Sequence, residues 1–315
     1  MTLVRPVDLY LASVIAVATG TGWLGSRAAK ETIAALLGSA AYRGSRRKRR
    51  LSEDAVARAL GPGVGLADRR RIVRGALREF WREALSLVPT RRERAVLDGV
   101  EVQGLERLRE PSRAGRGAIL WESALFGRRL LAKRILREHG FAVYQVHAEN
   151  HIGGFTNPDD GSVVRRRLIR PFFQRSQRRS VADVVELPLS DSLAFARILL
   201  RHLRDGHIVC SASDGTMGQN FVEVPVLGGT ARFATGVITL ARASGAPLLP
   251  MFCFAPRPGH TTLVIEPAIP IATKDTRDQT LQDAIAEYAR LLESYVMRYP
   301  TQYRGWHMLD RASAP

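Results

Sequence analysis

The sequence predicts an α/β fold in which a largely parallel central sheet carries helices on both faces, preceded by an N-terminal helical, membrane-associating segment. Three observations lead to this prediction. After residue 100, short apolar runs alternate with segments of helical periodicity, as in parallel sheets that are covered on both sides. The 315 residues are 45% hydrophobic, so they can bury a large core. The first hundred residues instead show helical periodicity interrupted by basic clusters.

Six apolar runs after residue 100 are the expected strands. They are Gly117–Trp121, Ala142–Val146, Val184–Leu187, His207–Ser211, Leu248–Phe254 and Thr262–Glu266. Four segments have the periodicity of helices, namely Phe126–His139, Ser190–Asp205, Ala234–Ser244 and Gln279–Tyr299. We therefore expect an apolar helical segment with a basic run at residues 1–50, a helical lead-in at 51–99 and an α/β domain at 100–315.

The N-terminal segment has the composition of a membrane-proximal element. Leu9–Leu24 is the most apolar stretch, and its 16 residues fall short of the roughly 20 that a spanning helix needs. Such a helix lies in the membrane interface or packs in a core. The basic run Arg43–Arg50 follows it, and basic side chains are attracted to anionic leaflets. The run is either a membrane-binding surface or an ordinary solvated loop.

A glycine pattern in this segment resembles a dinucleotide-binding fingerprint. Gly20, Gly22 and Gly25 have the GxGxxG spacing and follow the strand-like run Val14–Ala18. The fingerprint also requires a second apolar strand that ends in an acidic residue. The corresponding stretch, Tyr42–Arg50, is polar and basic. The context therefore argues against a Rossmann fold.

The charge balance indicates an anionic partner. The chain has 47 Lys and Arg against 30 Asp and Glu, a formal charge of +17. Nucleic acid, anionic lipid and a phosphorylated substrate all fit such an excess. Nucleic acid is disfavoured because the sequence lacks interleaved aromatics, a recognition module and a zinc motif. Cys210 and Cys253 lie far apart in apolar runs, which predicts buried thiols and no metal site.

Polar side chains follow three of the expected strands. Glu122 and Ser123 end the first, His147 follows the second, and Asp214 follows the fourth. The carboxyl ends of parallel strands meet at one edge of a sheet, where chemistry gathers. Carboxylates and imidazoles at that edge are suited to general acid–base catalysis.

Several motifs together resemble the lauroyl/myristoyl acyltransferases of bacterial lipid A biosynthesis, within the glycerolipid-type acyltransferase superfamily. The motifs are Val100–Glu106, Gly115–Leu120, Ser213-Asp214-Gly215, Phe221–Gly228 with Thr235-Gly236, Leu240–Pro250 and Tyr299–His307. The resemblance covers nearly the whole chain, and Leu240–Pro250 is its most specific part.

The resemblance implies a membrane-associated acyltransferase at the cytoplasmic face of the inner membrane. It would move a fatty acyl group from a thioester of carrier protein or coenzyme A to a hydroxyl or amine of a lipid-like acceptor. This chemistry needs no metal or redox cofactor, and no nucleic acid is expected as a partner. The expected substrate-binding residues are Phe126, Gly127, Arg128, Glu149, Asn150, His151, Asp214, Gly215, Gly228, Thr235 and Gly236.

The sequence departs from the family at the catalytic dyad. The family carries His-x4-Asp/Glu after its first strand, and Leu125 and Leu130 stand at those two positions here. A leucine cannot remove a proton from an acceptor hydroxyl. We expect Glu122 and His147 to form a replacement dyad, because the family fold would place their strands side by side. The alternative is a catalytically silent homologue that binds lipid or a partner enzyme.

Overall fold

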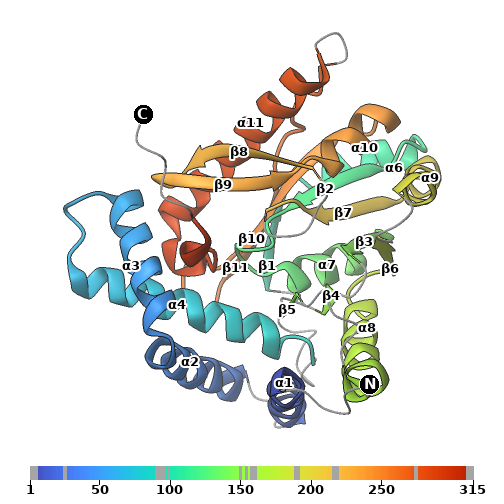
Figure 1. Cartoon of the computed structure of the whole chain (residues 1–315). Helices are drawn as coiled ribbons and strands as arrows, with labels where there is room; N and C mark the ends of the chain where they lie inside the picture. The colour runs from blue at the N-terminus through green and yellow to red at the C-terminus, as the bar shows by residue number, and fades with distance from the viewer. Residues whose placement is uncertain are drawn as a thin grey trace.

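The computed structural model describes residues 6–23, 27–88, 97, 99–148, 151–152, 155–156, 162–187, 192–214, 220–272 and 276–309. A seven-stranded sheet forms its centre, in the order β1-β11-β10-β2-β7-β3-β6 (Figure 1). The strands are β1 (Val100–Gln103), β2 (Ala118–Glu122), β3 (Val143–Ala148), β6 (Asp183–Leu187), β7 (Ile208–Ala212), β10 (Leu248–Phe254) and β11 (Thr261–Ile265). Strands β10, β2, β7, β3 and β6 run parallel to one another, and β11 is antiparallel to β10. The largely parallel sheet is confirmed.

All six expected runs form strands of this sheet, and five further strands were not predicted. Edge strand β1 pairs with β11, and β8 (Phe221–Val226) and β9 (Gly229–Ala234) form a separate antiparallel hairpin. The hairpin turns at Leu227 and Gly228, which both have positive φ (54° and 65°). Two consecutive residues with positive φ are typical of tight hairpin turns. Two short strands, β4 (His151–Ile152) and β5 (Phe155–Thr156), also pair with each other.

Helices cover both faces of the sheet, as predicted. On one side α6 (Glu106–Arg113) and α7 (Arg129–Glu138) pack against Ala118 and Leu120 of β2. On the other side lie α9 (Ser192–Arg204), α10 (Gly236–Ser244) and α11 (Arg277–Arg298), around Ile119 and Trp121. Alternate residues of β2 therefore serve two different cores, as expected for a strand that is buried on both faces.

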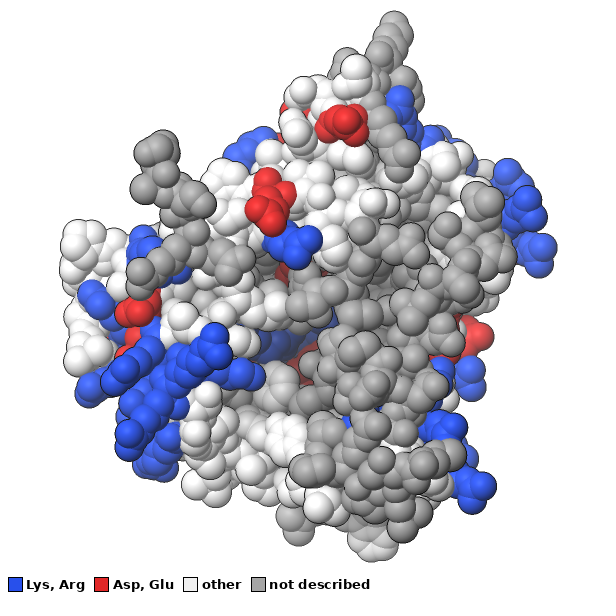
Figure 2. All heavy atoms as spheres, viewed as in Figure 1, with Lys and Arg blue, Asp and Glu red and all other residues white. Residues whose placement is uncertain are grey.

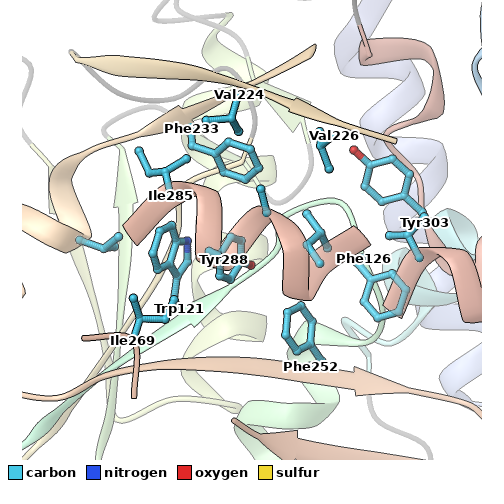
Figure 3. Close-up of a cluster of buried hydrophobic side chains, with 14 of the residues drawn as sticks. Trp121, Phe126, Val224, Val226, Phe233, Phe252, Ile269, Ile285, Tyr288 and Tyr303 are labelled. Carbon is cyan, nitrogen blue, oxygen red and sulfur yellow. The ribbon is translucent and has the colours of Figure 1, made fainter. Parts of the chain in front are cut away.

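An aromatic cluster fills the α11 side of the sheet (Figure 3). Trp121 stacks on Tyr288 of α11 with ring centroids 4.0 Å apart and planes 1° from parallel. Phe233 of β9 meets the same tyrosine edge-on, and Phe252 of β10 lies 6.0 Å from it. Aromatic side chains bury large areas, so this cluster binds α11 and the hairpin firmly to β2.

The N-terminal helices form one body with the sheet domain (Figure 1). They are α1 (Pro6–Trp23), α2 (Arg27–Gly44), α3 (Arg46–Leu60) and α4 (Leu66–Leu85). Helices α3 and α4 contact two short C-terminal 3₁₀ turns, η3 (Trp306–Met308) and η2 (Pro300–Gln302). The solvated-loop interpretation of the basic run is wrong, because all but its first residues begin α3. Arginine and lysine are good helix formers, and Ala55 and Val56 bury the inner face of that helix.

Helix α1 is held to the body by a buried ion pair. Asp8 is fully buried and accepts a hydrogen bond from Arg165 Nε at 2.9 Å. Arg165 begins η1 (Arg165–Ile169), a π-helical turn that leads into α8 (Arg170–Arg178). The strand-like run Val14–Ala18 lies within α1, as do Gly20 and Gly22, so a helical run and not a strand precedes these glycines, which agrees with rejection of the Rossmann fold. None of the described helices is long and apolar enough to cross a membrane.

Candidate active site

A cavity of about 820 Å³ lies at the carboxyl edge of the parallel strands. Residues of α4, α7, the start of α3 and the turn after β2 line it, together with His147 of β3. Most of its wall is apolar, including Leu77, Phe80 and Leu87. Figure 2 shows a hollow near the middle of this face, with Lys and Arg side chains gathered beside it. Cavities of this size and character hold lipid-like and drug-sized ligands.

Ser123 and Gly127 fix the turn between β2 and α7. Ser123 Oγ accepts hydrogen bonds from the backbone N–H groups of Leu125 and Phe126, at 3.1 and 3.0 Å, and donates one to Asp214. Gly127 has φ +68°, and a Cβ there would lie 2.1 Å from the carbonyl oxygen of Cys253. The position therefore requires glycine.

The turn presents Leu125 and Leu130 to the cavity. Arg304 stabilises this turn by donating hydrogen bonds to the carbonyl oxygens of Gly127 and Ala124, at 2.8 and 2.9 Å. The two positions that the sequence analysis predicts to correspond to the family dyad therefore lie in the cavity lining, and both are apolar.

Glu122 forms ion pairs with two basic side chains and is not paired with an imidazole. Its Oε1 lies 2.5 Å from Arg129 Nη2 and 2.9 Å from Lys133 Nζ, and the carboxylate is 1% exposed. Burial alone would raise the pKa of Glu122, but the two cations outweigh burial and hold it at about 2. A carboxylate with so low a pKa is a weak base. It pairs with Arg129 and Lys133, both of which line the cavity, and offsets one of their two positive charges.

The prediction that the strands of Glu122 and His147 lie side by side is wrong, because β7 lies between them. In the sheet order β2-β7-β3, Glu122 is opposite Ala212 of β7, and Gln145 of β3 is opposite Cys210 of β7. His147 therefore lies two strand spacings from Glu122 along the same row, about 10 Å between backbones. It is half-buried and lines the cavity, and its catalytic role stays a prediction.

Asp214 lies on the cavity wall with an elevated pKa. It follows β7, is buried, and accepts hydrogen bonds from Ser123 Oγ and the Ala124 N–H. Burial raises the pKa of Asp214 to about 6, although both hydrogen bonds lower it. Asp214 therefore fixes the turn after β2 from the cavity wall, and its expected part in substrate binding stays a prediction.

His307 is a second imidazole of the cavity, and the sequence analysis did not select it as a site residue. It lies on η3 beside the start of α3. Burial lowers the pKa of His307, and the nearby Lys48 lowers it further, so the ring is neutral at pH 7. The motif Tyr299–His307 was a signal for this residue, because it brings a histidine to the end of the matched segment.

Most of the other expected substrate-binding residues have structural roles. Phe126 packs in the aromatic core, and Arg128 donates to Thr261 Oγ1 at 2.9 Å. Gly228 makes the hairpin turn against the backbone of Arg58, and Thr235 and Gly236 begin α10. None of these residues lines the described cavity. Glu149, Asn150, Gly215 and the side chain of His151 lie outside the described residues.

The two cysteines are buried thiols, as predicted. Cys210 and Cys253 are unpaired, and burial raises the pKa of Cys253 to about 12. Within the described ranges, no three His, Cys, Asp or Glu side chains cluster in a way that could hold a metal ion.

Comparison with known proteins agrees with the resemblance seen in the motifs. Residues 165–311 match the sequence model of the bacterial lipid A biosynthesis acyltransferases. A phosphatidylinositol mannoside acyltransferase of Mycobacterium tuberculosis strain CDC 1551 / Oshkosh is 29% identical over 245 residues. That match covers 73% of this chain and 66% of the relative, just under two thirds of its length. Leu125 and Leu130 precede the family match, so their alignment with the dyad stays a prediction. The chain is therefore similar to the lipid A biosynthesis acyltransferases over residues 165–311, and to this relative over 245 residues.

Proposed function

We propose that this protein transfers a fatty acyl group from an acyl thioester of coenzyme A or carrier protein to a hydroxyl or amine of a lipid-like acceptor. Similarity to the lipid A acyltransferases and to the mycobacterial acyltransferase supports acyl transfer to a lipid-like acceptor. The observation that carries the proposal is the apolar cavity at the carboxyl edge of β2, β7 and β3, with imidazoles in its wall. An acyl chain fits the apolar stretch along α4, and an imidazole can take the acceptor proton.

His147 is the proposed general base. It extends from β3, a central strand of the rigid sheet, into the cavity, whereas Leu125 and Leu130 offer no proton acceptor. Deprotonation would let the acceptor oxygen or nitrogen attack the thioester carbonyl, and the thiol would leave with a proton. Glu122 takes no part in this step, because its carboxylate is bonded to Arg129 and Lys133.

The test of this assignment is acyl transfer by purified His147→Gln and His307→Gln proteins. Removal of a general base typically lowers the rate by about 10²–10⁴-fold. We expect that loss in His147→Gln with an unchanged melting temperature, and a smaller effect in His307→Gln. The reverse order would assign the base to His307. Full activity in both variants would exclude an imidazole base.

A silent homologue that binds lipid or a partner enzyme is the second candidate. The observation that favours it is the apolar character of both dyad positions inside the cavity. The double substitution Leu125→His with Leu130→Glu restores the residue types of the family dyad. If the unaltered protein is inactive with every thioester donor and the double variant is active, the silent interpretation holds. Comparable activity in the unaltered protein would refute it.

Attachment to the cytoplasmic face of the inner membrane is part of the proposal. Leu9, Trp23 and Leu36 of α1 and α2 are exposed, at 65%, 81% and 65%. Exposed apolar side chains beside a basic run favour an anionic bilayer surface. We expect the protein to float with anionic vesicles, and Trp23→Ser with Leu36→Ser to reduce flotation. Tight, salt-resistant binding to duplex DNA instead would favour the nucleic-acid interpretation.

A further inference from the structure

The lining of the cavity combines an apolar wall with an excess of positive charge. Five cationic side chains line it, Lys48, Arg49, Arg129, Lys133 and Arg304, against two carboxylates, Glu83 and Asp214. Apolar walls select alkyl chains, and uncompensated cations select anions. The lining therefore favours an amphiphile with an anionic group.

The cations at the inner end of the cavity already have partners within the protein. Arg129 and Lys133 share the carboxylate of Glu122, and Arg304 donates to two backbone carbonyl oxygens. Lys48 and Arg49 differ, because no described residue forms an ion pair with either side chain or accepts a hydrogen bond from it. The guanidinium of Arg49 lies 5.3 Å from the ring centroid of Tyr42, and Lys48 is exposed. The available positive charge is thus at the mouth.

The start of α3 carries charges of the sign that a helix N-terminus disfavours. Its first five residues are Arg46–Arg50, its first turn holds no acidic residue, and Ser45 makes no side-chain capping bond. The free N–H groups and the helix dipole already make this end positive, so added cations repel it. A bound anion would attract both the positive end of the helix dipole and the arginine side chains, and so offset the repulsion between them. Departures from local stability rules of this kind are typical of functional sites.

From these three features we infer that the mouth of the cavity is a phosphate subsite. Lys48, Arg49 and the first N–H groups of α3 bind the phosphate of an amphiphile whose alkyl chain extends along α4. A phosphate offers several acceptor oxygens, which suits two cations and a helix N-terminus better than a lone carboxylate. Ser45 and Ser52 add hydroxyl groups to the same part of the lining.

The inference rests on the proposed function and specifies its substrates. The phosphate belongs either to the thioester donor, as in coenzyme A, or to the headgroup of a phospholipid acceptor. Both sources present the same chemistry to Lys48 and Arg49, so the experiment separates them by ligand.

The experiment measures binding to the full chain by calorimetry without turnover. The ligands are a thioether analogue of decanoyl-coenzyme A, a ten-carbon lysophosphatidic acid and neutral monodecanoylglycerol, all below their micelle concentrations. The test variant is Lys48→Gln with Arg49→Gln. The matched control is Arg47→Gln with Arg50→Gln, which removes the same charge from the same helix at residues outside the cavity lining.

We expect at least one phosphate-bearing ligand to bind the unaltered protein more tightly than the neutral ligand. The test variant should weaken that ligand about tenfold or more, as loss of charged hydrogen bonds does. The control variant should weaken it less than about threefold, and the neutral ligand should bind all three proteins alike. The test variant should melt no lower than the unaltered protein, because repulsion at the helix terminus is relieved.

Three results would overturn the inference. They are equal losses in the test and control variants, equal losses for neutral and phosphate-bearing ligands, and no preference for phosphate in the unaltered protein. Phosphate-dependent binding in a protein that transfers no acyl group would retain the subsite and refute the proposed acyl transfer. Acyl transfer by a protein that shows no preference for phosphate-bearing ligands would retain the proposed acyl transfer and refute the phosphate subsite.

Discussion

Substitution of Glu122 by glutamine tests whether this carboxylate has a structural or a catalytic role. The structure places it, 1% exposed, between Arg129 and Lys133. Its pKa of about 2, against an ordinary value of 4.5, corresponds to ~3 kcal/mol of folding stability at neutral pH. Removal of one partner from a buried ion pair costs about 3–5 kcal/mol, because the other charges stay buried. We therefore expect Glu122→Gln to lower the free energy of unfolding by about 3–5 kcal/mol.

The assay is urea unfolding at pH 7, with Glu110→Gln as the matched control. Glu110 pairs with Arg116 at 2.6 Å, but both side chains are exposed, so the control should lose less than about 1 kcal/mol. Since folding lowers the pKa of Glu122, its contribution is complete above about pH 4.5 and is lost as pH falls toward about 2. A Glu122→Gln protein that is as stable as the control but catalytically dead would refute this reasoning.

Three further predictions concern other parts of the fold. Arg165→Ala should cost about 3–5 kcal/mol in urea unfolding, because it removes a buried cationic partner from the fully buried carboxylate of Asp8 in α1. Gly127→Ala should lower the melting temperature more than Gly140→Ala, since both have positive φ but only the former Cβ meets a carbonyl oxygen. Burial raises the pKa of Asp214 from 3.8 to about 6, so its contribution to stability is lost as pH rises through 6. Relative to the unaltered protein, the free energy of unfolding of Asp214→Asn should rise by up to ~3 kcal/mol between pH 4 and pH 7.

Local patterns were sufficient to predict most of the sheet. The run Leu248–Phe254 is apolar throughout because β10 is buried on both faces, and such strands are the easiest to recognise. Strand β1 was missed because it is an edge strand of four residues with alternating burial. The hairpin β8–β9 is not predicted as strands, although β8 lies within the motif Phe221–Gly228, because Pro225 and the polar residues of β9 weaken the strand pattern.

The site was predicted less completely, because its geometry depends on strand order. The sequence places the strand of His147 directly after that of Glu122, but β7 enters the sheet between them much later in the chain. Nothing local to β2 or β3 indicates that insertion. The cations around Glu122 come from α7 and lie seven and eleven residues after it in the sequence. They are four residues apart, about one helical turn, so they lie on the same face of α7, which packs over the strand. His307 reaches the cavity only through long-range contact between η3 and α3.

Acyl transfer in this cavity is tested most directly by comparing lipids made with and without the protein. Cells that produce the unaltered protein, His147→Gln or neither are extracted, and their lipids are compared by mass spectrometry. The account predicts one lipid class that gains the mass of a single fatty acyl group with the unaltered protein, and not with His147→Gln at equal protein levels. Identical lipid profiles in all three would contradict acyl transfer, and the same product from both proteins would contradict the role of His147.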